Sequence, residues 1–158
     1  MQPITPFLWF DSNAEEAVNF YTALFPNSTI KAVTRYPEGS PGPAGSVMTI
    51  GFQLNGQDYV ALNGGPHAKF TEAISFVVNC DSQQEVDHYW DKLTADGGQE
   101  VQCGWLKDKY GLSWQIVPTE FWKMLQDKDP ERMKRGFQAM MKMKKLDVNI
   151  LKKAQDGK

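Results

Sequence analysis

Apolar and polar residues follow a pattern that occurs twice along the chain, from Ile4 and again from Ile74. Each copy is an apolar run that ends in Asp-Ser, at residues 11–12 and 81–82. A Glu follows three residues after each Ser, which is the capping box that begins many helices. The pattern therefore predicts one arrangement twice, a strand that leads directly into a capped helix.

Helical periodicity follows each predicted cap. The apolar residues that fall on one face of the first helix are Ala14, Ala17, Val18, Tyr21, Leu24 and Phe25. Those of the second helix are Val86, Tyr89, Trp90 and Leu93. Pro26 is expected to end the first helix, and Gly97-Gly98 the second.

Three further strands are predicted after each helix. In the first copy they span residues 30–36, 46–54 and 58–63, with a hairpin turn at Asn55-Gly56 between the last two. In the second copy they span residues 99–102, 104–107 and 112–117. Helices set apart from antiparallel hairpins are typical of an α+β fold. We therefore expect two βαβββ modules whose curved antiparallel sheets surround a cup.

This interpretation places the first module at residues 1–66, the second at 67–118, and a C-terminal helical tail at 119–158. Within the tail, Asp129-Pro130-Glu131 has the residue types of a helix N-terminus. A final short helix is expected around Ile150 and Leu151. Apolar residues recur in the tail at roughly helical spacing, at Met133, Phe137, Met140, Met141 and Leu146.

Composition and charge exclude several functional classes. The 158 residues have 41% hydrophobic and 23% charged side chains, which is ordinary for a soluble globular protein. The net charge of −2 gives no basic field, so neither nucleic acid nor a membrane is an expected partner. We expect no secretory signal, because the first residues, Met1-Gln2-Pro3-Ile4, lack a basic patch followed by an apolar core. We expect a cytoplasmic protein in which Cys80 and Cys103 are reduced thiols, with a disulfide as the alternative.

Three strings resemble one family, namely residues 4–21, 109–118 and 140–147. Together with the doubled module, they resemble the PhnB-like branch of the vicinal oxygen chelate superfamily, which includes glyoxalases, bleomycin-resistance proteins and dioxygenases. Some members of that branch carry the label 3-demethylubiquinone-9 3-methyltransferase. The chain shows no glycine-rich strand-to-helix turn of the kind that holds an adenosyl cofactor, so we do not expect methyl transfer.

The resemblance implies four metal-ligand positions, and this chain departs from the superfamily pattern at each of them. The positions fall at or near Ile4, Ser75, Gln115, and either Leu62 or Asn63. Hydrocarbon, hydroxyl and neutral amide groups are poor ligands for a divalent transition metal. We therefore expect neither a metal nor another cofactor.

Aromatic and neutral polar side chains instead lie on the segments that would line the cup. This composition is typical of a small-ligand pocket, although each aromatic residue alone is equally interpretable as core. Trp114 and Gln115 cannot both face the cup, because side chains alternate along a strand, and we expect Gln115 to face it. The predicted ligand-binding residues are Phe7, Trp9, Asn63, His67, Ser75, Trp105 and Gln115.

Two functions remain open. One is a metal-free module that binds a small, partly aromatic or planar organic ligand. The other is a metal-dependent lyase, isomerase, dioxygenase or hydrolase with non-standard ligands. The missing ligands favour binding, and no catalytic residue can be named. We also expect an obligate homodimer in which the apolar stripe of the tail contributes to the interface, the alternative being a tail that packs only on its own domain.

Overall fold

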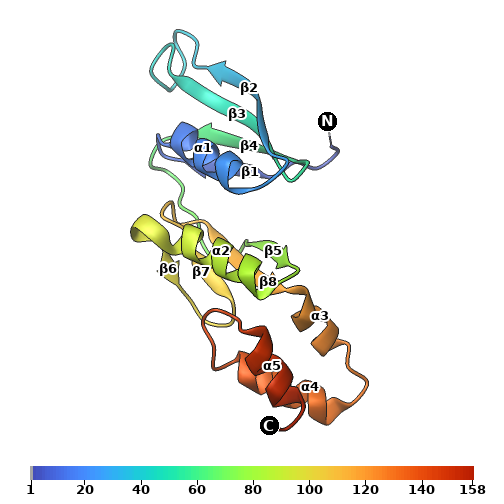
Figure 1. The fold of residues 1–158 in the computed structure, drawn as a ribbon. Helices are drawn as coiled ribbons and strands as arrows, with labels where there is room; N and C mark the ends of the chain where they lie inside the picture. Colours follow the sequence, from blue (N-terminus) through green and yellow to red (C-terminus); the bar gives the residue numbers. More distant parts are fainter. Residues whose placement is uncertain (1) are drawn as a thin grey trace. The chain divides into compact units, whose positions relative to one another are not determined.

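The computed structural model describes residues 2–158, and the chain divides into two compact units between Phe70 and Thr71 (Figure 1). Each unit contains one four-stranded sheet with a helix on one face. No helix among the described residues is long and apolar enough to cross a bilayer.

Unit 1 is the first βαβββ module. Its elements are β1 (Phe7–Phe10), α1 (Ala14–Leu24), β2 (Thr29–Arg35), β3 (Val47–Leu54) and β4 (Gln57–Asn63). The strands are ordered β1-β4-β3-β2. The apolar face of α1 packs on one side of this sheet, where Leu8, Phe10, Ile50, Phe52 and Tyr59 are buried. Phe7 and Trp9 alternate with Leu8 and Phe10, so they lie on the opposite, open face.

Unit 2 repeats the module and adds the tail. Its module contains β5 (Phe76–Cys80), α2 (Gln83–Thr94), a short 3₁₀ turn η1 (Ala95–Gly97), β6 (Gln99–Glu100), β7 (Trp105–Lys107) and β8 (Ser113–Pro118). The strand order β5-β8-β7-β6 is equivalent to that of unit 1. Helix α2 covers the face on which Cys80, Leu106, Trp114 and Ile116 are buried.

The predicted α+β class and the doubled βαβββ pattern are confirmed, but the sheets are mixed rather than wholly antiparallel. In each module the first strand pairs in parallel with the last, β1 with β4 and β5 with β8. The remaining pairs are antiparallel. The parallel pair joins residues 53 positions apart in unit 1 (Phe7 with Val60) and 38 positions apart in unit 2 (Phe76 with Trp114), so no local alternation reveals it.

Only the second of the two predicted capping boxes forms. Ser82 Oγ accepts a hydrogen bond from the backbone N–H of Glu85 at 3.2 Å, while the Glu85 carboxylate accepts from the N–H of Asp81 at 2.7 Å. The box predicted at Ser12 is wrong. Helix α1 begins after Asn13, and the N–H of Ala14 donates to Asn63 Oδ1 at 2.8 Å.

The tail folds into three helices: α3 (Thr119–Leu125), α4 (Pro130–Met140) and α5 (Val148–Gln155). Helix α3 was not predicted, whereas Asp129 caps α4 as expected, with its carboxylate accepting from the Glu131 N–H at 2.9 Å. A small core joins the three helices to β8 and consists of Val117, Phe121, Met124, Met140, Leu146 and Leu151.

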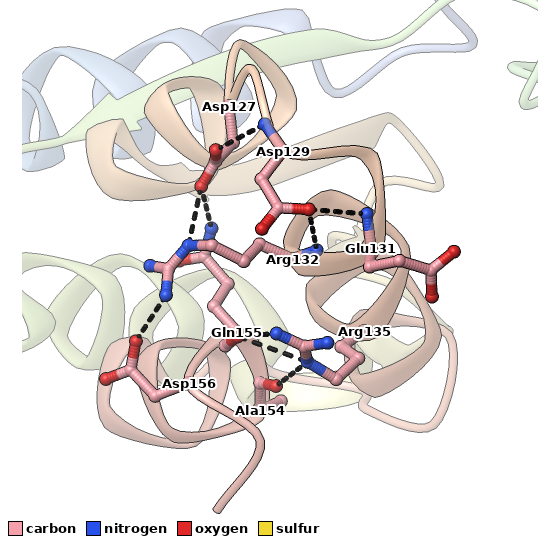
Figure 2. Close-up of polar contacts among 8 residues, drawn as sticks. All are labelled: Asp127, Asp129, Glu131, Arg132, Arg135, Ala154, Gln155 and Asp156. Atoms are coloured by element: carbon pink, nitrogen blue, oxygen red, sulfur yellow. Dashed lines mark hydrogen bonds and ion pairs between the residues drawn. The ribbon is translucent and has the colours of Figure 1, made fainter.

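Polar contacts fix α4 and α5 to one another. Figure 2 shows the Arg132 guanidinium between the carboxylates of Asp127 and Asp156, at 3.1 and 2.8 Å. Arg135 donates to the carbonyl oxygens of Ala154 and Gln155 at the end of α5. Carbonyl groups in the last turn of a helix have no partner within the helix, so a cation there is favourable.

The turn between α4 and α5 is attached to the module of unit 2. Gln83 of α2 donates to the carbonyl oxygen of Leu146 at 3.0 Å and accepts from the N–H of Val148 at 2.9 Å. Lys145 forms an ion pair with Asp87 at 2.8 Å. The predicted apolar stripe is divided by this packing, because Met140 is buried whereas Phe137 and Met141 are exposed.

Candidate functional site

Unit 1 contains a pocket of about 620 Å³ at the ends of β1 and β4. Three of the predicted ligand-binding residues, Trp9, Asn63 and His67, line it. Phe7, which is 57% exposed on the open face of the same sheet, does not. The structure thus brings together the predicted ligand-binding residues that lie in unit 1, apart from Phe7, and this group includes His67, which the sequence analysis assigned to the second module.

The polar groups of that pocket largely serve the fold. Trp9 Nε1 donates to the carbonyl oxygen of Gly65 at 2.9 Å, and its ring packs so closely on Gly64 that a Cβ atom there would overlap it. Both polar atoms of the Asn63 amide are hydrogen-bonded. Its oxygen accepts from the N–H of Ala14 at the start of α1, and its nitrogen donates to the carbonyl oxygen of Val47 at 3.1 Å. His67 is exposed at the rim.

The open face of the second sheet carries two cross-strand rows. Trp105 pairs with Gln115 in one row, and Lys107 pairs with Ser113 in the other. Directly paired residues project to the same side of a sheet. All four side chains therefore lie on the face opposite α2, and the expectation that Gln115 and Trp114 lie on opposite faces is confirmed. Trp114 is buried on the α2 face, where its Nε1 donates to Asp108 Oδ2 at 2.9 Å.

A second pocket, of about 460 Å³, lies on this open face. Trp105, Lys107, Ser113 and Cys103 are among its lining residues. Ser113 is only 1% exposed, and its hydroxyl is the one buried side-chain polar atom in residues 2–158 that has no hydrogen-bond partner. A buried hydroxyl without a partner is unfavourable, so a hydrogen bond to this group would be stabilising.

Charge at the second pocket comes from Lys107. Its ammonium group lies 3.2 Å from the carboxylate of Glu72, which is itself largely exposed. An exposed ion pair of this kind is weak and can be exchanged for a contact with a ligand anion. The pocket thus combines an indole wall, an ammonium group and an unpartnered hydroxyl.

Two of the predicted ligand-binding residues bond to one another beside this pocket. Gln115 Nε2 donates to Ser75 Oγ at 2.8 Å. The resemblance places metal ligands at these two positions, but a neutral amide and a hydroxyl that already satisfy each other do not fit a divalent metal. No group of His, Cys, Asp and Glu side chains within residues 2–158 is arranged to hold a metal ion.

The two cysteines lie in different surroundings, and the buried Cys80 does not have those of an activated nucleophile. Both thiols are free, as expected. Burial of Cys80, together with the nearby carboxylates of Glu85 and Asp81, raises the pKa of its thiol to about 12. Cys103 lines the second pocket, with its sulfur 3.8 Å from the thioether of Met141.

Ser113 and Lys107 were not predicted as site residues, although one signal could have identified Ser113. It lies two positions before Gln115 on the same strand, so strict alternation assigns both side chains to one face. Lys107 required the register between β7 and β8, which the sequence does not specify.

Two βαβββ modules, each with its first and last strands paired in parallel, define a protein of the vicinal oxygen chelate superfamily. Residues 2–117 match the family model described as 3-demethylubiquinone-9 3-methyltransferase, and the chain belongs to that family as a PhnB-like member. A PhnB protein from Bacillus cereus is 40% identical, with a TM-score of 0.67 over 74% of this chain and 99% of its own.

More distant structures share the fold alone. Protein PA1353 from Pseudomonas aeruginosa is 22% identical, with a TM-score of 0.61 over 75% of this chain and 98% of its own. The fosfomycin resistance protein FosX from Listeria monocytogenes is 16% identical, with a TM-score of 0.50 over 75% of this chain and 93% of its own. No curated protein matches the chain significantly.

The strand-to-helix turns do not support the methyltransferase activity that the family's name describes. The turn between β1 and α1 is Asp11-Ser12-Asn13, and that between β5 and α2 is Asp81-Ser82. Neither contains glycine, whereas an adenosyl cofactor is commonly held at a glycine-rich turn of this kind.

Proposed function

We propose that this protein binds a small organic ligand on the open face of its second sheet, without the metal that is usual in its superfamily. The observation that carries the proposal is the buried, unpartnered hydroxyl of Ser113 in a pocket walled by Trp105. A ligand oxygen that bonds this hydroxyl would remove the cost of leaving it unsatisfied.

The same pocket indicates the class of ligand. Trp105 offers a flat apolar surface, which suits a planar or aromatic body. Lys107 offers the positive charge, which suits a carboxylate or a similar anionic group. Gln115 lies opposite Trp105 in the same cross-strand row, and together with Ser75, to which it is hydrogen-bonded, it adds neutral polar contacts. The proposed ligand is therefore a small aromatic or planar carboxylate.

Isothermal titration calorimetry with a panel of aromatic carboxylates and their uncharged amides tests the proposal. We expect binding of carboxylates, at least about tenfold weaker binding of the amides, and a loss of about 1.5–3 kcal/mol for Ser113→Ala or Lys107→Met. Trp105→Ala should weaken binding by a similar amount because the apolar wall is removed.

Trp9→Phe is the matched control, because it changes an indole in the other pocket. It should leave the affinity unchanged. Equal affinity of the wild type, Ser113→Ala and Trp105→Ala would place the ligand elsewhere, and tight binding of a divalent metal by purified, tag-free protein would contradict the metal-free part of the proposal.

A further inference from the structure

The charged side chains at the second pocket form a pair of opposite sign. Among the described residues that line this pocket, only Glu72 and Lys107 are charged. Their carboxylate and ammonium groups lie 3.2 Å apart, and both residues belong to unit 2. The pocket therefore has no net formal charge, and a ligand there meets a positive and a negative group side by side.

Both members of this pair can bind further partners. Hydrogen bonds from its own backbone N–H and from Lys107 hold the pKa of Glu72 below its ordinary value, so its carboxylate is ionised at neutral pH. The Glu72 side chain is 70% exposed. An ammonium group can donate several hydrogen bonds, and among residues 2–158 that of Lys107 donates to Glu72 alone. The ion pair is thus a dipole on the pocket wall, with hydrogen-bonding capacity that the fold does not use.

A ligand that is only an anion matches one half of this dipole. A carboxylate bound beside Lys107 also lies close to Glu72, because the two protein groups are 3.2 Å apart, and the two negative charges repel. A ligand that carries an ammonium group next to its carboxylate avoids this conflict. When it lies antiparallel to the ion pair, each ligand group is next to the protein group of opposite sign.

The neighbouring residues extend the match beyond charge. Ser113 pairs directly with Lys107 across β7 and β8, so its unpartnered hydroxyl lies on the same face and can donate to the same ligand carboxylate. Trp105 lies two positions before Lys107 on β7, which places it about 7 Å away on that face. An aromatic α-amino acid carries its ring a short carbon link away from its two charged groups, so it can contact the indole and the ion pair together.

We propose that the ligand of this pocket is an aromatic α-amino acid in its zwitterionic form. Its carboxylate binds Lys107 and Ser113, and its ammonium group binds Glu72. Its ring packs on Trp105. This inference rests on the proposed function, because it names the ligand class of the same site. It makes Glu72 the residue that selects amino acids over other aromatic acids.

Isothermal titration calorimetry with a matched set of ligands tests the proposal. The set is L-phenylalanine, 3-phenylpropionate, which lacks the ammonium group, and 2-phenylethylamine, which lacks the carboxylate. We expect the wild type to bind L-phenylalanine at least about tenfold more tightly than either of the others. Lys107→Met should weaken the binding of both L-phenylalanine and 3-phenylpropionate, because each loses the partner of its carboxylate.

The decisive variant is Glu72→Gln, which should reverse the preference. It should weaken L-phenylalanine binding at least about tenfold, because the ligand ammonium loses its partner. It should bind 3-phenylpropionate as tightly as the wild type does, or more tightly, because a negative charge near the ligand is removed. Glu131→Gln makes the same chemical change at an exposed position outside the pocket and should behave like the wild type.

The outcomes separate this inference from the proposed function on which it rests. Wild-type protein that binds 3-phenylpropionate as tightly as L-phenylalanine would overturn the inference and leave the proposed function standing. Equal losses for both ligands in Glu72→Gln would do the same, because Glu72 would then not distinguish them. Failure of all these ligands and of the whole carboxylate panel would overturn both.

Discussion

The two modules share a strand order, but they use their polar side chains differently. In unit 1 the Asn63 amide and the Trp9 indole form hydrogen bonds with backbone groups around their pocket. In unit 2 the turn before β8 is held by Asp108, while the Ser113 hydroxyl is left without a partner. A repeated fold therefore need not give two equivalent sites, because a pocket offers a ligand only those groups that the fold has not already used.

The largest expected effect of a substitution is in the turn of unit 2. The buried carboxylate of Asp108 accepts from the N–H groups of Tyr110 and Leu112 and from the Trp114 indole, at 2.9, 3.1 and 2.9 Å. Asp108→Ala should destabilise unit 2 by about 3 kcal/mol or more, because these donors lose a charged acceptor. Denaturation followed by hydrogen exchange and mass spectrometry would assign the loss to its unit.

The matched change in unit 1 is Asn55→Ala in the β3–β4 hairpin. Asn55 has a φ of 46°, which an alanine adopts at a cost of about 1 kcal/mol. The side chain is exposed, so little else should be lost. Similar losses for Asp108→Ala and Asn55→Ala would show that the buried carboxylate does not hold its turn.

A smaller difference is expected between the two helix caps. Asn63→Ala removes both the acceptor at the start of α1 and a donor to Val47, so we expect a loss of about 2 kcal/mol. Ser82→Ala removes one local cap from α2 and should cost about 1 kcal/mol. Urea unfolding of both variants measures the difference, and Asn63→Asp, which keeps the acceptor, should recover part of the first loss. A larger effect at Ser82 would contradict this order.

The smallest expected effect is a loss of stability at acidic pH. Hydrogen bonds from Lys145 and Gln83 hold the pKa of Asp87 below its ordinary value of 3.8. Ionised Asp87 therefore stabilises the attachment of the tail above about pH 4, and this contribution is lost as the pH falls through the lowered pKa. The pair is partly exposed, so the change should be below about 1 kcal/mol.

Hydrogen exchange of the amides of α5 at about pH 5 and about pH 3 would detect this loss after correction for the intrinsic exchange rates. Asp87→Asn should remove most of the pH dependence, because the ionisable partner is gone. A variant that keeps the full pH dependence would assign it to another carboxylate of the tail, such as Asp127, whose pKa is also lowered, by the N–H of Asp129 and by Arg132.

Local signals in the sequence predicted most of the helices and strands correctly. The capping box at Ser12 and helix α3 were predicted wrongly or not at all, because they depend on contacts between residues far apart in the chain. The capping box at Ser82 formed because its partner is three residues away. The equivalent box at Ser12 did not, because Asn63, 49 residues from Ala14, supplies the acceptor. Helix α3 follows Pro118 without a side-chain cap and is held by burial of Phe121 and Met124 in a core that forms only with α4 and α5.

The candidate site was predicted in the same uneven way. Alternation placed Gln115 and Trp114 correctly on opposite faces. Alternation could not show that the Asn63 side chain accepts a hydrogen bond from the first residue of α1. It also could not show that Lys107 pairs with Ser113, because that pairing depends on the register between two strands. A ligand-binding residue is thus harder to predict than its strand, because its availability depends on every competing partner in the fold.

The attachment of the tail through Gln83 also has a consequence for biosynthesis. During synthesis, the Gln83 side chain can accept its hydrogen bond from the N–H of Val148 only after 65 further residues have been added to the chain. At about 5–20 residues per second, the ribosome needs about 3–13 s to supply that partner. During this interval the second module lacks its tail contacts, so Val117 and the surface around it, which the tail covers in the finished protein, remain exposed.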